Sequence, residues 1–383
     1  MEKTLGLLLM IGLGLILQRK ISSSDQLKGI KVVILCVALP ATIFVALLKV
    51  ELSGMMLALP LLALLINIVL LVAFKFSAGA LVKITPGRKR TLMMLLPSLA
   101  PGLSCFPFIS EYLGDESLAL AALADVGNKL FVLIFLYLLA MHWYYKYNSA
   151  STTGSKMKLK SMIIAMISEP INLVMMAALA LMAMGINLSS LPESLSLVIL
   201  RLSSIMAPLI LLFIGLAVRI NRNDFAVILR LLSWRSGLML IISGLVLLFI
   251  PSFSTATALL IIVLPQSSCS FWPFAHMNTV QNLENEGSHH TFDTSFALSL
   301  LACSLPFSTL LIMGVFSFES IMINPVYTLF TGFILLIGAF VPYLLQKLRS
   351  LFSAGDATLA TPQEKEVEGH ASIAAEKILI DTN

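Results

Sequence analysis

Charged side chains are scarce in this sequence, and their scarcity excludes an ordinary soluble protein. Only 12% of the 383 residues are charged, 58% are hydrophobic, and the mean hydropathy is +0.96. A soluble chain carries about twice that share of charge. The composition therefore predicts an all-α, polytopic membrane protein embedded in a lipid bilayer. The net charge of +5 does not indicate a nucleic-acid partner, because the lysines and arginines cluster beside apolar segments.

Cysteines and nucleotide-binding motifs are equally scarce. All four cysteines fall inside expected membrane spans without C-x-x-C spacing, which excludes a disulfide framework and a thiol metal site. The chain has no Walker loop, no dinucleotide fingerprint and no nucleophile–base motif. We therefore expect no enzyme, no cofactor and no metal, although His289, His290 and Asp293 share one loop. Any active transport would be coupled to Na⁺ or H⁺, or driven by the membrane potential.

Long hydrophobic runs, in contrast, fill the chain. The first is followed by Gln18-Arg19-Lys20 rather than by a small-residue cleavage site, which favours a membrane span over a signal peptide. A polar linker at 143–160 and a polar tail at 350–383 lie outside the runs. The eleven expected spans are 4–18, 30–49, 55–82, 91–114, 117–142, 161–186, 194–219, 235–251, 255–276, 291–317 and 324–346.

Two of these runs are interrupted by prolines, at Leu96–Tyr112 and at Leu264–His276. A proline removes an amide donor and clashes with the carbonyl four residues back, so no continuous helix survives there. The freed backbone groups cannot face lipid and must point into protein or into a watery cavity. Matching interrupted helices in two halves are typical of a transporter's substrate site. The helix-breaking residues are Pro97, Pro101, Pro107, Pro265 and Pro273.

The two interruptions belong to a repeat with an offset of 168 residues. Pro40 and Pro208 keep that offset, as do Leu96-Pro97 and Leu264-Pro265. Coincidence in a leucine-rich chain is the alternative, but prolines deep in spans rarely match by chance. We expect a first five-span repeat at 1–142, a second at 161–319, an eleventh span at 320–349 and a solvated tail at 350–383.

Basic residues fall on one side of the membrane if the spans alternate. They occupy the loops near 19–31, 83–90, 146–160 and 219–235, whereas the opposite loops are mostly acidic. Positive charge marks cytoplasmic loops, so we expect the N-terminus outside and the linker and tail in the cytoplasm, in a plasma or cell inner membrane. Five spans per half is an odd number, which makes the two repeats inverted.

Ionisable residues in the fifth expected span are the first candidates for a site. Asp125 lies ~12 Å and Lys129 ~18 Å from the start of the span at Ser117, a depth at which charges are costly and face a cavity or a partner. Their i,i+4 spacing lets the two charges neutralise each other, which is the structural interpretation. In the functional interpretation, Asn128 and Lys129 bind an anionic substrate and Asp125 couples a proton or Na⁺.

The interrupted helices supply the rest of the candidate site. Each break creates a half-helix N-terminus, near Pro107 and near Pro273, that favours an anion. A serine in a span usually bonds its own helix, but four polar residues between two prolines at Gln266–Ser270 are harder to explain in that way. The further candidate substrate-binding residues are Ser98, Ser104, Cys105, Gln266, Ser267, Ser268 and Ser270.

The order of these motifs resembles one known family. PFISEYLGDESLALAALADVGNKLFVLIF, at Pro107–Phe135, is similar to the fourth and fifth spans of the auxin efflux carrier family of membrane transport proteins, and Met206–Ile220 is similar to its seventh span. Glu169-Pro170 stands where an Asn-Pro often opens the sixth span. The chain departs from the family in two places. Ala100-Pro101-Gly102 replaces an asparagine that is usual near the broken fourth helix, and the eleventh span is extra.

The resemblance implies a fold and a function. The fold has ten spans in two inverted five-helix repeats, as in bile acid–sodium symporters. Spans one, two, six and seven form a scaffold; the others form a mobile domain with crossed, broken fourth and ninth helices. Members of the family move organic anions such as auxins, malate or malonate. We therefore expect a secondary transporter of small carboxylate anions that works by alternating access and could pair as a homodimer.

Two other functions fit the same residues. A Na⁺-coupled symporter would carry another anion, such as bicarbonate or a bile-acid-like solute, and uptake with and without Na⁺ separates it. A membrane sensor would keep the fold and signal through the tail at 350–383. Deletion of the tail would abolish the output of a sensor but spare the flux of a transporter.

Overall fold

The computed structural model describes residues 2–21, 23–49, 58–81, 85–148, 164, 170–217, 224–250, 253–284 and 290–341. All regular structure in these ranges is helical, as the composition predicts. Six helical runs are long and apolar enough to cross a membrane, and four shorter apolar helices accompany them. The protein is thus a helical, multi-pass membrane protein. The inverted repeat and the count of eleven spans stay predictions, and the tail, most of the linker, Glu169 and His289 lie outside the described residues.

The N-terminal helices follow the expected runs with shifted ends. The second span begins at Asp25 rather than at residue 30, because a capping box between Ser23 and Gln26 starts the helix in the polar stretch before the apolar run. A π-helical turn follows directly, and its i→i+5 hydrogen bonds enclose one residue more than those of an α-helix. The elements are α1 (Glu2–Leu17), α2 (Ser24–Val33), η1 (Ile34–Ala38), α3 (Leu39–Leu48) and α4 (Leu59–Leu81).

The first interrupted segment divides where its prolines predict. Pro101 and Pro107 occupy the first turns of two new helices, where a missing amide costs nothing. Instead of the expected loop between the fourth and fifth spans, α7 has only a kink at Gly114. The φ of Gly114 is 80°, a value that favours glycine. The elements are α5 (Pro86–Leu95), α6 (Pro101–Ser104), α7 (Phe106–Leu130), η3 (Phe131–Phe135) and α8 (Leu136–Asn148), so the first six residues of the expected linker are helical.

The second half contains the other interrupted segment. The eighth expected span begins ten residues early, at Phe225, and the ninth continues beyond its break to Gln281. The elements are α10 (Pro170–Ala183), η4 (Leu188–Ser190), α11 (Glu193–Ser204), α12 (Met206–Ala217), α13 (Phe225–Phe249), α14 (Thr255–Val263), η5 (Leu264–Gln266), α15 (Trp272–Gln281), α16 (Thr294–Ser317) and α17 (Glu319–Met322), with a last apolar helix at Pro325–Val341.

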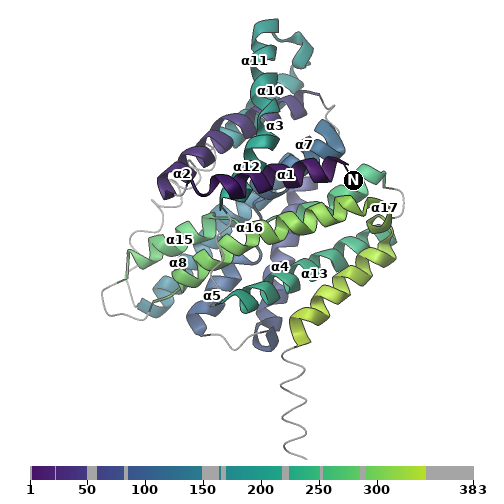
Figure 1. The fold of residues 1–383 in the computed structure, drawn as a ribbon. Helices are drawn as coiled ribbons and strands as arrows, with labels where there is room; N and C mark the ends of the chain where they lie inside the picture. The colour runs from purple at the N-terminus through teal and green to yellow at the C-terminus, as the bar shows by residue number, and fades with distance from the viewer. Residues whose placement is uncertain are drawn as a thin grey trace, which may run out of the picture.

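The helices pack in two groups. In the first group α1 lies along α12, and α3 lies along α10 and α11; Figure 1 shows these helices in the upper part of the molecule. In the second group α4 packs on α7, α8 on α15, and α13 on α14 and α16. The last helix joins the second group where Gly332 faces Gly237 of α13. Between the groups, α7 contacts both α3 and α12.

Close contact of α4 with α7 positions the central part of α7. A Cβ atom at Gly127 would lie 1.7 Å from the carbonyl oxygen of Pro60, so only glycine allows this approach. It brings Asn67 of α4 within 3.1 Å of the side chain of Asn128, deep in the protein. The candidate residues of the fifth span are therefore held against α4 by backbone contact.

Candidate functional site at the crossing of two interrupted helices

The two interrupted segments meet and hydrogen-bond each other. The amide of Ala100 donates to the carbonyl of Ser268 at 2.8 Å. The amide of Ser270 donates to Oγ of Ser98 at 3.0 Å, and the amide of Ser268 donates to Oγ of Ser104 at 2.9 Å. Each break thus hydrogen-bonds backbone groups of the other, so these groups are not left unsatisfied within the membrane.

Arg235 satisfies the carbonyls that the first break leaves open. Its Nε donates to the carbonyl of Leu96 at 2.8 Å and its Nη2 to that of Ser98 at 3.3 Å, and the residue is only 1% exposed. The prediction that Arg235 belongs to a basic loop is wrong, because Arg235 lies inside α13. An arginine within the apolar run Phe225–Phe249 was the available signal, because a charge at that depth needs a partner.

Asn128 likewise hydrogen-bonds backbone groups in the middle of the first break. Its Oδ1 accepts from the amide of Leu99 at 3.1 Å, and its Nδ2 donates to the carbonyl of Leu99 at 2.9 Å. The same Nδ2 lies 2.7 Å from Oδ1 of Asp125. Both ends of the Asn128 amide therefore bind the protein itself and hold residues 96–100 against α7.

Asp125 and Lys129 are buried together. Their charged atoms lie 3.7 Å apart, and each side chain is about 7% exposed. Nζ of Lys129 also donates to Oδ1 of Asn172 on α10 at 2.9 Å, which links α7 to the first group of helices. This geometry matches the interpretation in which the two charges neutralise each other, with Asn172 as an added partner.

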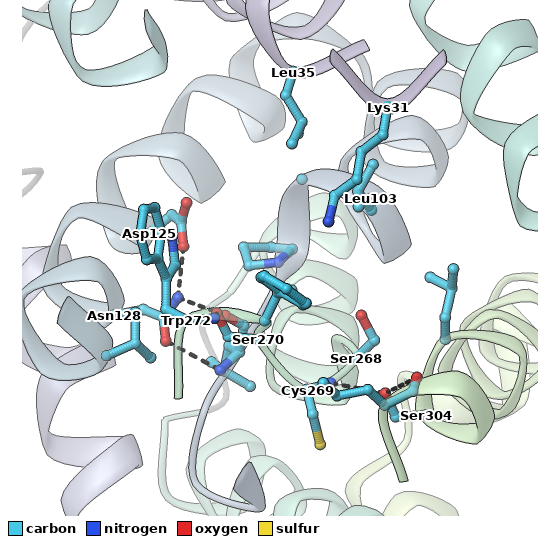
Figure 2. A pocket seen from close by; sticks show the side chains of 18 of the residues that line it. Lys31, Leu35, Leu103, Asp125, Asn128, Ser268, Cys269, Ser270, Trp272 and Ser304 are labelled. Carbon is cyan, nitrogen blue, oxygen red and sulfur yellow. Dashed lines mark hydrogen bonds between the residues drawn. The ribbon is translucent and has the colours of Figure 1, made fainter. Parts of the chain in front are cut away.

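A cavity of about 450 Å³ lies beside the crossing. Five of the expected substrate- and ion-binding residues line it, namely Asp125, Asn128, Lys129, Ser268 and Ser270, and so does the helix-breaking Pro101. Figure 2 shows Asp125 and Asn128 on one side of it and Ser268 on the other. The volume falls in the usual range of small-molecule sites.

The remaining expected substrate residues are buried but lie outside the cavity lining. Cys105 approaches the carbonyl of Val263 at 3.6 Å, Ser267 donates to the carbonyl of Leu264 at 2.6 Å, and Gln266 donates to that of Ser236 at 3.4 Å. Ser98 and Ser104 accept the two amides of the second break described above. The polar groups of all five residues therefore stabilise the interrupted segments from behind the cavity.

Most residues of the lining were not expected from the sequence, among them Lys31, Phe271, Trp272 and Ser304. The prediction that Lys31 belongs to a loop is wrong, because Lys31 lies in the last turn of α2. Its Nζ is 4.7 Å from the centre of the Phe271 ring. Ser304 accepts the amide of Cys269 at 3.3 Å. The position of Lys31 on a helix before a hydrophobic run was the only signal that sequence offered.

The loop residues considered for a metal have other partners. His290 lies 3.0 Å from a carboxylate oxygen of Glu284. Asp293 caps the amide of Phe296 at the start of α16 and accepts from Nε of Arg88 at 2.8 Å. No group of three metal-ligating side chains occurs within the part of the chain that the structure describes.

Comparison with known proteins assigns the chain to no family. No protein-family model matches it, and no curated protein matches its sequence.

Proposed function

We propose that this protein is a secondary transporter of small organic anions of the carboxylate class, with the cavity at the crossing as its substrate site. One observation carries the proposal: the cavity lining has two lysines, Lys31 and Lys129, and one carboxylate, Asp125. The excess is positive in a site surrounded by apolar side chains. Charge is poorly screened in such a place, so an anion is favoured there and a cation is disfavoured.

The backbone of the crossing supports the same preference. α15 begins at Trp272 beside the cavity, and the partial positive charge of a helix N-terminus favours an anion. Arg235 adds a further buried cation directly behind the first break. No matching carboxylate approaches Arg235 among the described residues. Positive charge therefore surrounds the cavity not only in its lining but also in the layer directly behind it.

The packing in two groups supports alternating access. Lys129 reaches from α7 to Asn172 of α10, and Lys31 reaches from α2 to Phe271 at the second break. α2 packs on α12 of the first group, and Phe271 directly precedes α15 of the second group, so both contacts join one group of helices to the other across the cavity. A relative movement of the groups would break these two contacts and open the cavity to the other side. The division agrees with the scaffold and mobile domain that the resemblance to auxin efflux carriers implies.

An uptake screen tests the proposal. The full chain is reconstituted in proteoliposomes and supplied with labelled carboxylates, bicarbonate and neutral amides, with and without Na⁺ or pH gradients. We expect saturable uptake of at least one carboxylate and none of its amide, relative to protein-free vesicles. Stimulation by Na⁺ would favour the symporter alternative, and stimulation by a pH gradient would assign H⁺. Uptake of amides and cations but of no carboxylate would overturn the proposal.

A further inference from the structure

Lys31 projects into the cavity from the side opposite Asp125. It lies on the last turn of α2, directly before the π-helical turn η1, and Figure 2 shows its amine pointing toward the serines of the second break. Lys129 likewise precedes a π-helical turn, η3. Such turns occur frequently at functional sites because they re-aim the side chains next to them.

The ammonium group of Lys31 rests on an aromatic ring rather than on a carboxylate. Nζ lies 4.7 Å from the centre of the Phe271 ring, and within the described residues no carboxylate lies within ion-pairing distance of it. Lys28, one turn earlier on the same helix, is exposed and pairs with Asp25 at 3.0 Å. The two neighbouring lysines therefore differ in both position and partner.

The charges of the lining add up to one positive unit. Asp125 offsets Lys129, with which it pairs at 3.7 Å, and Lys31 remains. A singly charged anion would make the lining neutral. A doubly charged anion would leave a negative charge that no group of the lining offsets, because Arg235 lies behind the first break and donates to its carbonyls, and this is unfavourable in a mostly apolar cavity.

We propose that Lys31 binds the carboxylate of the substrate, leaving the Phe271 ring to do so, and that the substrate carries a single negative charge. Phe271 and Trp272 flank the bound acid, and the ring that Lys31 releases faces its apolar part. The inference rests on the proposed transport function and assigns the charge recognition of that site to Lys31. Lys129 then serves as the partner of Asp125 and Asn172.

Matched ligands and variants test this assignment. The probes are mandelate, mandelamide and phenylmalonate, which share a phenyl group and carry one, no and two negative charges at neutral pH. The variants of the full chain are Lys31→Gln and Lys31→Arg, with Lys28→Gln as the control from the same helix. Uptake into proteoliposomes and the heat-unfolding midpoint with each probe are measured for all four proteins.

For the wild type and for Lys28→Gln, we expect uptake of mandelate and a raised unfolding midpoint in its presence, with weaker effects of phenylmalonate and none of mandelamide. Lys31→Gln should raise the KM for mandelate about tenfold or more, since a charged hydrogen bond is lost. Its unfolding midpoint without ligand should be unchanged, and Lys31→Arg should restore much of the affinity.

The outcomes separate this inference from the function on which it rests. If the wild type takes up anions but Lys31→Gln keeps the same KM and the same preference for mandelate over mandelamide, only the role of Lys31 is overturned. A preference of the wild type for phenylmalonate would overturn the single charge. If the wild type takes up no anion and none raises its unfolding midpoint, the proposed function fails as well.

Discussion

At the scale of single residues, side chains replace the helical hydrogen bonds that the prolines remove. Ser98 and Ser104 accept amides of the second break. Asn128 pairs with both backbone groups of Leu99, and Arg235 binds two carbonyls of the first break. An irregular backbone can persist inside a membrane protein because every one of these groups has a partner.

Arg235→Met should destabilise the protein. Methionine is similar in length but donates no hydrogen bond, so the carbonyls of Leu96 and Ser98 would be left without a donor. Each unsatisfied carbonyl would lower the free energy of unfolding by about 1–3 kcal/mol. Relief from burying a guanidinium offsets part of this loss. The heat-unfolding midpoint in detergent measures the net effect, which we expect to be a clear decrease. The control is Arg230→Met on the same helix, which within the described residues donates only to the carbonyl of Ala226 on its own helix. Equal midpoints for both variants would contradict this role.

The pairing of Asp125 with Lys129 predicts recovery in a double mutant. Lys129→Ala leaves a buried carboxylate without its cation and should lower both stability and uptake. Asp125→Asn with Lys129→Ala removes both charges and should restore much of each. If Lys129 binds the substrate instead, the double mutant should not recover uptake. An inactive double mutant together with an active Lys31→Gln variant would therefore assign substrate binding to Lys129 and not to Lys31.

At the scale of elements, the position of α7 depends on backbone contact with α4. Gly127 lies against Pro60, where a Cβ atom would stand 1.7 Å from the carbonyl oxygen. This contact sets Asn128 against both Asn67 and Leu99. The first break is thus positioned by a helix contact outside the interrupted segment.

Gly127→Ala should therefore separate α4 from α7. Overpacking of this kind costs about 1–3 kcal/mol or more, and uptake should fall because Asn128 moves with the helix. Gly314→Ala in α16 is a matched control, since beyond its own helical turn no atom of the described residues lies within 4 Å of the added Cβ; there we expect no loss of stability. Equal unfolding midpoints of the two variants would show that the helices tolerate the added methyl group.

The ends of α5, α13 and α16 are joined by charge, and this contact should depend on pH. Arg88 binds Asp224 at 3.2 Å and Asp293 at 2.8 Å. Burial acts to raise the pKa of Asp293, but the amide of Phe296 and then the side chain of Arg88 outweigh it and hold the pKa below its ordinary value of 3.8. The hydrogen bond that Arg88 donates to Asp293 correspondingly raises the pKa of Arg88.

A carboxylate with a depressed pKa adds stability that is fully present above its ordinary pKa and is lost as the pH falls through the folded value. Asp293→Asn should therefore lower the unfolding midpoint at neutral pH. The difference from the wild type should narrow as the pH falls below about 4. Asp25→Asn is the control, because Asp25 is 91% exposed and its one ion pair in the described part of the chain is with Lys28 on its own helix. A difference that stays constant down to low pH would contradict the charged contact.

At the scale of the whole molecule, hydropathy and prolines predicted the helical membrane class and both interruptions, because these signals are local. Lys31 and Arg235 were misplaced in loops for the same reason, since a basic residue beside an apolar run looks the same whether it faces water or the interior. Asn128 and the serines of the breaks were expected to face a substrate. The structure gives Ser98, Ser104 and Asn128 backbone partners from distant segments, and such contacts leave no pattern in one sequence.

Deletion of the tail at 350–383 should leave uptake intact. The cavity and both breaks lie within 31–305, so a transporter needs none of the tail for flux. The truncated and full chains are reconstituted at equal amounts, with protein-free vesicles as the baseline. Loss of uptake in a truncated protein that keeps its unfolding midpoint would favour the sensor alternative.

Counterflow tests the central claim most directly, because it detects a site that alternates between the two sides. Proteoliposomes with the full chain are preloaded with an unlabelled carboxylate from the uptake screen and diluted into a trace of the same labelled acid. We predict a transient accumulation of label above its equilibrium level, absent from protein-free vesicles and from vesicles preloaded with the amide. Monotonic equilibration at the same rate with and without preloading would contradict a carrier with alternating access.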